Sequence, residues 1–274
     1  MGRPLKIGIL NIMHDNKNTR HRFEEIFASL SVPIDLTFFY PTKYPNGKIP
    51  ERITRLAQPL DLKKVPNFDA FIITGSPIER FPFKDITYID EVYHLIDALR
   101  VNGIEQLYLC WGAMAALNYL YNIGKHELPE KVFGIFPEKI LKPSPLLTGI
   151  RQNFLAPHAR YWESNRYEIE ENPELEINAV SDEGHLFLVT APDHPHQSFL
   201  FSHLEYGRRG LLKEYQRERE AHPDRFYKKP ENYLLDPDNL AEPQYQWEGV
   251  RRQFFDNWIK QIIKNQEISY CLAE

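Results

Sequence analysis

The stretch LYLCWGAMAAL, Leu107–Leu117, decides the fold. Its apolar start is typical of a buried strand, and the small residues after Cys110 favour a helix. A strand, a sharp turn and a helix with a nucleophile at the turn form the elbow of α/β hydrolytic folds. The positive end of that helix favours a thiolate and can stabilise an oxyanion. The alternative is that Cys110 is a buried small hydrophobic side chain, as many free cysteines are.

Strands and helices alternate over the first half of the chain. Apolar runs predict strands at Lys6–Asn11, Ile34–Phe39, Asp69–Thr74 and Gln106–Leu109. Helical spacing predicts helices over Arg20–Leu30 and Asp85–Arg100. This order indicates an α/β fold with a doubly wound, mainly parallel sheet. Ligands of such sheets bind beyond the carboxyl ends of the strands, where Asn11, Gly75 and Cys110 lie.

From Leu128 onward the sequence contains shorter strand-like segments. They are Val132–Leu141, Phe154–Leu155, Ile177–Ser181, Leu186–Ala191 and Gln197–Ser202. We expect them to extend the same sheet or to form a small antiparallel layer. Helices are predicted over Gly207–His222 and Trp247–Lys264, with a loosely held tail beyond. No repeat or linker divides the chain, so a single domain over residues 1–274 is expected.

Composition excludes several classes of protein. A net charge of −5 argues against a general nucleic-acid binder. No apolar run approaches the roughly 20 residues that cross a bilayer, and no signal peptide is recognisable, which predicts a cytoplasmic protein without a membrane partner. Its two cysteines, Cys110 and Cys271, fit a reducing compartment. Without clustered cysteines, no zinc site is expected.

A reactive cysteine needs a base, and the base needs an orienting group. His203 follows the apolar run Phe199–Phe201, and Glu205 lies two residues later. In an extended segment these two side chains share a face, so the carboxylate can hold the imidazole as in a catalytic triad. The alternative is an ordinary surface His-x-Glu pair. Together with the elbow cysteine, the pair suggests a Cys-His-Glu triad.

Seven motifs, in order along nearly the whole chain, resemble the homoserine O-acyltransferase family. They are TGSPIE (Thr74–Glu79), CWGAMAALNYLY (Cys110–Tyr121), PEKVFGIF (Pro129–Phe136), FLAPHARY (Phe154–Tyr161), SHLEY (Ser202–Tyr206), ENY (Glu231–Tyr233) and FFDNW (Phe254–Trp258). This resemblance implies a fold like that of class I glutamine amidotransferases. It also implies that acetyl or succinyl passes from acyl-CoA to an amino-acid hydroxyl.

The resemblance implies a role for each matching catalytic residue. Cys110 matches the nucleophile that accepts the acyl group as a thioester, His203 the general base and Glu205 its orienting carboxylate. The backbone N–H groups of Trp111 and Ser76 would form the oxyanion hole.

The last position of the TGSPIE motif, Glu79 in this chain, matches the position that selects the acyl donor in the family. Glycine there accompanies succinyl-CoA, and glutamate accompanies acetyl-CoA, so Glu79 implies acetyl-CoA as co-substrate. A carboxylate in the pocket repels the free carboxylate of a succinyl group and fills space beside an acetyl group. The alternative is a solvent-facing acid ahead of a helix.

The acceptor positions depart from the family pattern. The implied substrate-binding positions are Lys131, Ala159, Arg160 and Glu248. Lys131 is retained, but the family motif PHSRY has become PHARY at Ala159. The family W-R-x-H, whose arginine is expected to bind the amino-acid carboxylate, has become Trp247–Val250 with Glu248, and Arg251 and Arg252 follow a turn later. Loss of a carboxylate clamp is not conservative.

The N-terminal motif departs as well. The family has lysines where this chain has Asp15 and Asn16. Because the acceptor positions change while the catalytic and donor positions stay, L-serine is favoured slightly over L-homoserine. Alternatives are a homoserine O-acetyl- or O-succinyltransferase proper, a glutaminase-type amidotransferase, and a non-catalytic paralogue that binds an amino acid or CoA. No bound cofactor is expected, and a homodimer is expected only by analogy.

Overall fold

The computed structural model describes residues 3–13, 15–44 and 47–272, and side chains as far as residue 267, so the side chain of Cys271 lies outside this range. The strands are β1 (Leu5–Leu10), β2 (Ile34–Tyr40), β3 (Gln58–Pro59), β4 (Ala70–Ile73), β5 (Glu105–Leu109), β6 (Lys125–Ile140), β7 (Phe154–Ser164), β8 (Glu176–Ser181), β9 (Leu186–Thr190), β10 (Gln197–Leu200), β11 (Leu234–Asp236) and β12 (Ala241–Pro243). The α-helices are α1 (Asn16–Ala28), α2 (Glu51–Thr54), α3 (Ile89–Val101), α4 (Trp111–Tyr121), α5 (Arg166–Glu171), α6 (Gly210–Ala221) and α7 (Glu248–Leu272). Short 3-10 turns lie at η2 (Leu62–Asn67), η3 (Phe83–Asp85) and η4 (Pro145–Leu147).

Ten of these strands form one sheet in the order β3-β2-β1-β4-β5-β10-β9-β8-β6-β7. The pairs from β3 through β10 are parallel, and the pairs from β10 through β7 are antiparallel. The predicted α/β class with a mainly parallel sheet is therefore confirmed. The second half of the chain extends this sheet and forms no separate layer with β6–β10, whereas β11 and β12 pair separately.

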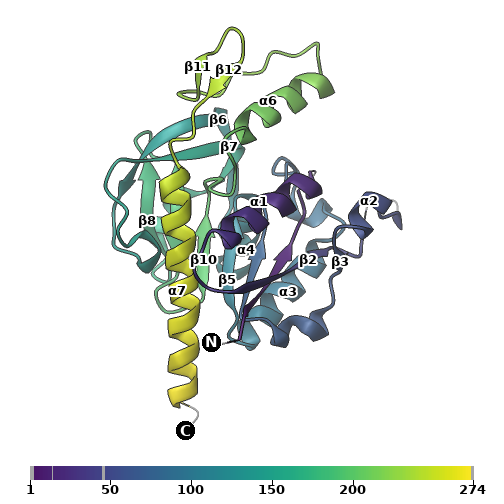
Figure 1. The fold of residues 1–274 in the computed structure, drawn as a ribbon, viewed down its shortest axis with the longest axis vertical. Coiled ribbons are helices and arrows are strands. Elements are labelled where there is room, and N and C mark those ends of the chain that lie inside the picture. The colour runs from purple at the N-terminus through teal and green to yellow at the C-terminus, as the bar shows by residue number, and fades with distance from the viewer. Residues whose placement is uncertain (1–2, 14, 45–46, 273–274) are drawn as a thin grey trace.

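Helices cover both faces of the sheet, and side chains alternate between two cores. On one face, Ile7, Ile9 and Leu107 pack with α1 and α7. On the other, Phe71 and Tyr108 pack with α3 and α4. Figure 1 shows α7 running along the first face beside α1.

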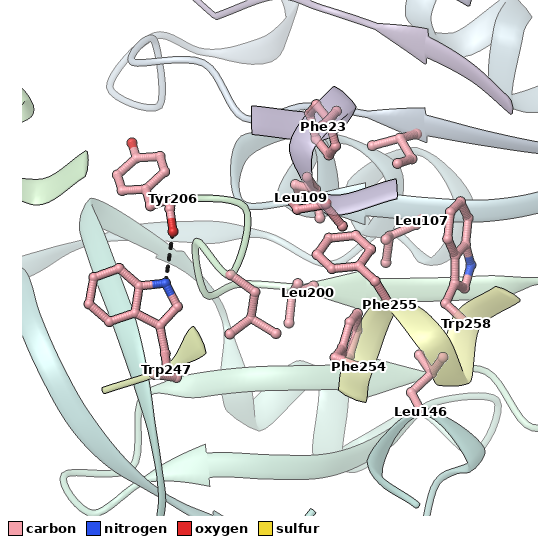
Figure 2. Packing of buried hydrophobic residues seen from close by; sticks show 14 of the residues in the cluster. Phe23, Leu107, Leu109, Leu146, Leu200, Tyr206, Trp247, Phe254, Phe255 and Trp258 are labelled. Carbon is pink, nitrogen blue, oxygen red and sulfur yellow. Dashed lines mark hydrogen bonds between the residues drawn. The ribbon is translucent and has the colours of Figure 1, made fainter. Parts of the chain in front are cut away.

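The terminal helix contributes much of the first core. Phe254, Phe255 and Trp258 are fully buried, and Figure 2 shows them among strand residues that include Leu107 and Leu109. Full burial of each such side chain contributes roughly 1.5–3 kcal/mol. This packing anchors α7 across β5, the strand that precedes Cys110.

Several predicted boundaries differ from the structure, among them those of α3, β7 and α7. Residues 83–85 form a 3-10 turn after Pro82, so α3 begins at Ile89 rather than at Asp85. The predicted strand Phe154–Leu155 continues to Ser164, because β6 pairs with β7 along its length and buries polar residues there. Helix α7 continues to Leu272, since Asn265 and Gln266 hydrogen bond to Glu105 and Asp69.

Candidate active site

The predicted strand–turn–helix around Cys110 is present. Cys110 lies between β5 and α4 with φ 47° and ψ −108°, a backbone conformation that non-glycine residues rarely adopt. Such strain persists only where the surroundings enforce it, and it is common at functional sites. Here the Cys110 N–H donates to the Leu200 carbonyl at 2.8 Å, and the Cys110 carbonyl accepts from Met114 N–H at 3.0 Å.

Helix α4 approaches the end of β4 closely enough to require glycine at one position. A Cβ on Gly112 would lie 2.6 Å from the Ile73 carbonyl oxygen. The contact seats the first turn of α4 against the sheet, with its unpaired N–H groups at the Cys110 turn. The Trp111 N–H is among these groups, in the place expected of an oxyanion donor.

His203 reaches Cys110 through the strand order. Strand β10 pairs in parallel with β5, with Leu200 opposite Leu109, so the residues that follow β10 lie beside Cys110. The His203 N–H donates to the Pro157 carbonyl at 2.9 Å, and the His203 carbonyl accepts from Tyr206 N–H at 2.9 Å. The predicted strand through Ser202 ends at Leu200, so His203 and Glu205 meet within a turn and not along an extended segment.

The imidazole of His203 is held on two sides. Its Nδ1 lies 2.7 Å from Glu205 Oε1, and both side chains are buried. Its ring stacks on the Tyr206 ring with centroids 4.5 Å apart. Burial opposes a charge on the ring, but the Glu205 carboxylate and the Cys110 thiol outweigh burial and raise the pKa of His203 well above its ordinary value. The arrangement therefore favours the protonated, imidazolium form of His203.

Gly75 provides the space where these groups meet. A Cβ at this position would lie 3.3 Å from Cys110 Cβ and 3.4 Å from His203 Cε1. Cys110 is 5% exposed and Ser76, the next residue after Gly75, is also 5% exposed, so access to the sulfur is narrow. Ser76 directly follows Gly75, and Trp111 directly follows Cys110, so both residues lie next in the chain to the groups that meet here.

Glu79 and Lys131 belong to one electrostatic cluster. Burial raises the pKa of Glu79, Glu214 adds to this effect, and Lys131 opposes it. The Tyr161 N–H donates to Glu79 Oε1 at 3.4 Å, so the carboxylate faces β7. Since Glu214 is also electrostatically coupled to His203, the cluster lies near the His203 imidazole.

Lys131 is buried between two acids on α6. Its Nζ lies 2.7 Å from Glu214 Oε1 and 2.9 Å from Glu218 Oε1. Burial alone would raise the pKa of Glu214, but nearby positive charges, Lys131 first among them, lower it to about 2. The Tyr206 hydroxyl donates to Glu214 Oε2 at 2.8 Å, which links this cluster to the ring that stacks on His203.

Ala159 and Arg160 face opposite sides of β7. Ala159 shares its face with Tyr161 and lies opposite Phe133 of β6. The Arg160 side chain is fully buried: it donates to Glu163 and to the carbonyl oxygens of Phe201 and Leu186. These contacts hold the Arg160 side chain in the interior, against the Phe201 carbonyl that precedes His203. The substrate contact implied by the resemblance stays a prediction.

Glu248 lies at the exposed first turn of α7. Its described electrostatic neighbour is Tyr245, and none of its described contacts reaches Cys110 or His203. Arg251 is buried with its guanidinium 5.3 Å from the centre of the Tyr245 ring, whereas Arg252 is exposed. The structure therefore does not bring Glu248 together with the other candidate site residues.

Asp15 and Asn16, which replace family lysines, shape the start of α1. The Asp15 carboxylate accepts from Asn18 N–H at 3.1 Å as the helix cap. The buried Asn16 amide donates to the Met13 carbonyl at 2.7 Å. Both side chains therefore serve the local backbone.

Several site residues escaped prediction. Glu214 and Glu218 lie one turn apart on a helix that is mostly charged, and burial alone distinguishes them from its solvated face. Their four-residue spacing places both acids on one face of the helix, but their pairing with Lys131 could be predicted only if the order of the strands were known. Tyr206 was easier to find from the sequence than these two acids, because it directly follows Ser202–Glu205, the segment that carries His203.

Among the residues that the structure describes, no helix combines the length and the apolar character needed to cross a membrane. Within the same part of the chain, no three His, Cys, Asp or Glu side chains are grouped so as to hold a metal ion.

Comparison with known proteins shows similarity to O-acyltransferases that act on amino acids. The sequence model of a family described as homoserine O-succinyltransferase matches residues 1–270. A serine O-acetyltransferase from Lactobacillus acidophilus is 48% identical over 97% of this chain and 98% of its own, and one from Lacticaseibacillus casei is 45% identical over 96% and 97%. A homoserine O-acetyltransferase from Thermotoga neapolitana is 35% identical over 99% of this chain and 88% of its own.

Among solved structures, a glutamine amidotransferase from Thermotoga maritima is similar, with a TM-score of 0.65 at 12% identity over 96% of this chain and 99% of its own. At this identity the likeness shows the fold alone. The expected likeness to glutamine amidotransferases is therefore confirmed as a fold.

Proposed function

Because the chain belongs to the homoserine O-succinyltransferase family of acyltransferases, we propose that it transfers acetyl from acetyl-CoA, through a thioester on Cys110, to the hydroxyl of L-serine. The observation that carries the proposal is that Cys110 and His203 meet beside Gly75, with Glu205 Oε1 2.7 Å from His203 Nδ1. We take residues 1–274 as one catalytic domain. Acetyl-CoA acts as a co-substrate, and no further cofactor is needed.

In the first half-reaction the Cys110 thiolate attacks the carbonyl carbon of acetyl-CoA. The Trp111 and Ser76 N–H groups stabilise the resulting oxyanion. The carbon–sulfur bond to CoA then breaks, and the CoA sulfur takes the proton of the His203 imidazolium. Acetyl-Cys110, neutral His203 and free CoA result.

In the second half-reaction His203 acts as a general base. It takes the proton of the serine hydroxyl while the serine oxygen attacks the thioester carbonyl. The Cys110 thiolate leaves, and O-acetylserine is released. The imidazolium beside the thiolate is thereby restored, so each cycle starts and ends with the same protonation state. Glu205 holds the Nδ1 proton throughout.

Glu79 supports acetyl as the acyl group. Its carboxylate lies in the cluster beside His203, within the electrostatic reach of Glu214. A succinyl group would bring a second carboxylate toward these acids, which disfavours it. An acetyl group carries no such charge.

The acceptor must be recognised as a zwitterion with a short hydroxyl side chain. Glu214, which is electrostatically coupled to His203, forms an ion pair with Lys131, so charges of both signs are available near the proposed acceptor site. Serine is favoured over homoserine because Asp15, which caps α1, and Asn16 stand where the resemblance implies lysines. The two relatives at 48% and 45% identity are also named serine O-acetyltransferases. A homoserine O-acetyltransferase is the second candidate, since the relative at 35% identity carries that name.

A side-by-side acceptor assay tests the proposal. Initial rates are measured with L-serine and L-homoserine, each with acetyl-CoA and then with succinyl-CoA. We expect the highest kcat/KM with serine and acetyl-CoA, and parallel double-reciprocal lines, the signature of a ping-pong mechanism. A preference for homoserine would make homoserine the acceptor in place of serine. Intersecting double-reciprocal lines would argue against a covalent intermediate. Ammonia release from glutamine would instead favour the amidotransferase alternative.

A further inference from the structure

Lys125, the first residue of β6, contacts the segment that carries Glu79. Its ammonium donates hydrogen bonds to the Glu79 carbonyl oxygen and, at 2.8 Å, to the Phe81 carbonyl oxygen. Both acceptors belong to the main chain of the turn after β4. A side chain from a distant part of the sequence therefore binds this turn at two points.

The turn has few backbone bonds of its own. After β4 ends at Ile73, residues 77–80 form turns, and the backbone bond described within them runs from Phe81 N–H to the Ile78 carbonyl at 3.0 Å. Backbone carbonyl groups need hydrogen-bond partners, and a turn with few internal hydrogen bonds depends on other groups to fix its conformation. The Lys125 ammonium supplies partners for two of them.

Lys125 itself starts from a fixed position. It lies opposite Ser164 in the β6–β7 ladder, and the preceding Gly124 carbonyl accepts from Asn165 N–H at 2.8 Å. The ammonium lies 4.7 Å from the centre of the Phe83 ring and 4.9 Å from that of Trp162, so aromatic faces enclose the charge. Rigid anchoring at the backbone and enclosure at the tip make the side chain a strut between β6 and the turn.

The Glu79 carboxylate points away from Lys125 in its contacts, toward the cluster of Glu214 and Lys131. While the Glu79 carbonyl faces Lys125, its Oε1 accepts from Tyr161 N–H, and the carboxylate is coupled to Glu214 and Lys131. Burial lowers the pKa of Lys125 to about 8, and the Glu79 charge opposes this shift, so the ammonium stays mainly charged at neutral pH. The main chain and the side chain of Glu79 are thus held by different partners, Lys125 and the Tyr161 N–H.

We propose that Lys125 is a positioning residue for acyl-donor selection: its ammonium fixes the main chain of the Glu79 turn so that the Glu79 carboxylate faces the incoming acyl group. This inference rests on the proposed role of Glu79 in the donor pocket. It assigns to Lys125 no contact with the reacting atoms. Its signature is therefore a change in donor preference, which a merely stabilising lysine would not alter.

The test compares Lys125→Met, Lys125→Arg and the control Lys139→Met. Lys139 lies on the same strand, is exposed, and pairs with Asp182 at 3.2 Å. For each protein, kcat/KM is measured with acetyl-CoA and with succinyl-CoA at saturating serine, and the KM for serine is measured separately. A displaced pocket group changes such a ratio by about tenfold.

We expect the acetyl-to-succinyl ratio to fall about tenfold in Lys125→Met, with the KM for serine unchanged. Lys125→Arg keeps a charged donor for both carbonyls and should retain most of the ratio, as should Lys139→Met. An unchanged ratio in Lys125→Met, or an equal loss with both donors, overturns the inference. If Lys125→Met does not fold, the neutral Lys125→Gln is judged by the same ratio.

Glu79→Gly, measured in parallel, separates this inference from the proposed function. A shifted ratio in Glu79→Gly with an unshifted ratio in Lys125→Met leaves the donor pocket intact and rejects the strut. An unshifted ratio in Glu79→Gly rejects the role of Glu79, and the inference about Lys125 with it.

Discussion

The Cys110 and His203 side chains meet across Gly75: Cys110 Cβ and His203 Cε1 lie 3.3 Å and 3.4 Å from the point that a Cβ on that glycine would occupy. Two parallel neighbours, β5 and β10, deliver these side chains from distant parts of the sequence. The site therefore depends on sheet order, and each of its parts can be tested separately.

Gly75→Ala should lower activity without unfolding the protein. The added methyl group would press on Cys110 and His203 and shift them by a few tenths of an ångström, which should reduce kcat by about tenfold. Gly249→Ala is the matched control, because a Cβ there meets nothing within 4 Å and the position lies in the first turn of α7. Steady-state rates and thermal midpoints are measured for both. Full activity in Gly75→Ala would show that the two side chains need no such fit.

Glu205→Gln should move the alkaline limb of the pH profile to lower pH. The Glu205 carboxylate helps to raise the pKa of His203, so its loss lets burial lower that pKa. The imidazolium that acylation needs is then lost at a lower pH. At pH 8 we expect kcat/KM for acetyl-CoA to fall about a hundredfold. The same raised pKa contributes stability that is fully present below about pH 6.5 and is lost as the pH rises through the folded-state value.

The control for this variant is Glu183→Gln. Glu183 pairs with His185 at 3.5 Å and is 62% exposed, so its loss should leave the pH profile of catalysis unchanged. An alkaline limb that stays in place in Glu205→Gln would exclude Glu205 as the orienting carboxylate.

Glu79→Gly should raise the use of succinyl-CoA relative to acetyl-CoA by at least about tenfold, since it removes both a negative charge and side-chain volume from the donor pocket. Glu79→Gln removes the charge and keeps the volume, so the pair separates repulsion from fit. Competition between the two donors, with the products resolved by mass spectrometry, gives the ratio directly. The same ratio in all three proteins would place Glu79 outside the pocket.

Arg160→Met should lower the free energy of unfolding by about 3–5 kcal/mol, because it leaves the buried Glu163 carboxylate without its guanidinium partner. Urea denaturation measures this loss, and Arg151→Met, an exposed arginine nearby, should change the value by no more than about 0.5 kcal/mol. If Arg160 binds the acceptor instead, its loss would raise the KM for serine and leave the unfolding free energy intact.

Prediction from the sequence succeeded where the pattern is local. The apolar runs around Lys6–Asn11 and Leu107–Leu109 correspond to β1 and β5, and the small residues after Cys110 correspond to α4. The His203–Glu205 pair forms as predicted, but through a turn that Tyr206 N–H closes, because β10 ends before it.

Prediction failed where long-range pairing sets the environment. Strand β7 carries His158, Arg160 and Glu163, which lie beyond the predicted strand Phe154–Leu155. Their contacts with one another and with groups from other strands allow these polar side chains to be buried. The same is true of Lys131 and its acidic partners on α6, whose proximity depends on how α6 packs against β6. Such pairs cannot be inferred from spacing along one element.

The central claim is that Cys110 carries the acetyl group between the two half-reactions. Mixing the protein with acetyl-CoA in the absence of serine, followed by rapid acid quenching and intact mass spectrometry, tests it most directly. We predict one acetyl adduct per chain, located on the Cys110 peptide, lost on addition of serine and absent from Cys110→Ala. An adduct of equal yield in Cys110→Ala, or full turnover by that variant, would contradict the claim.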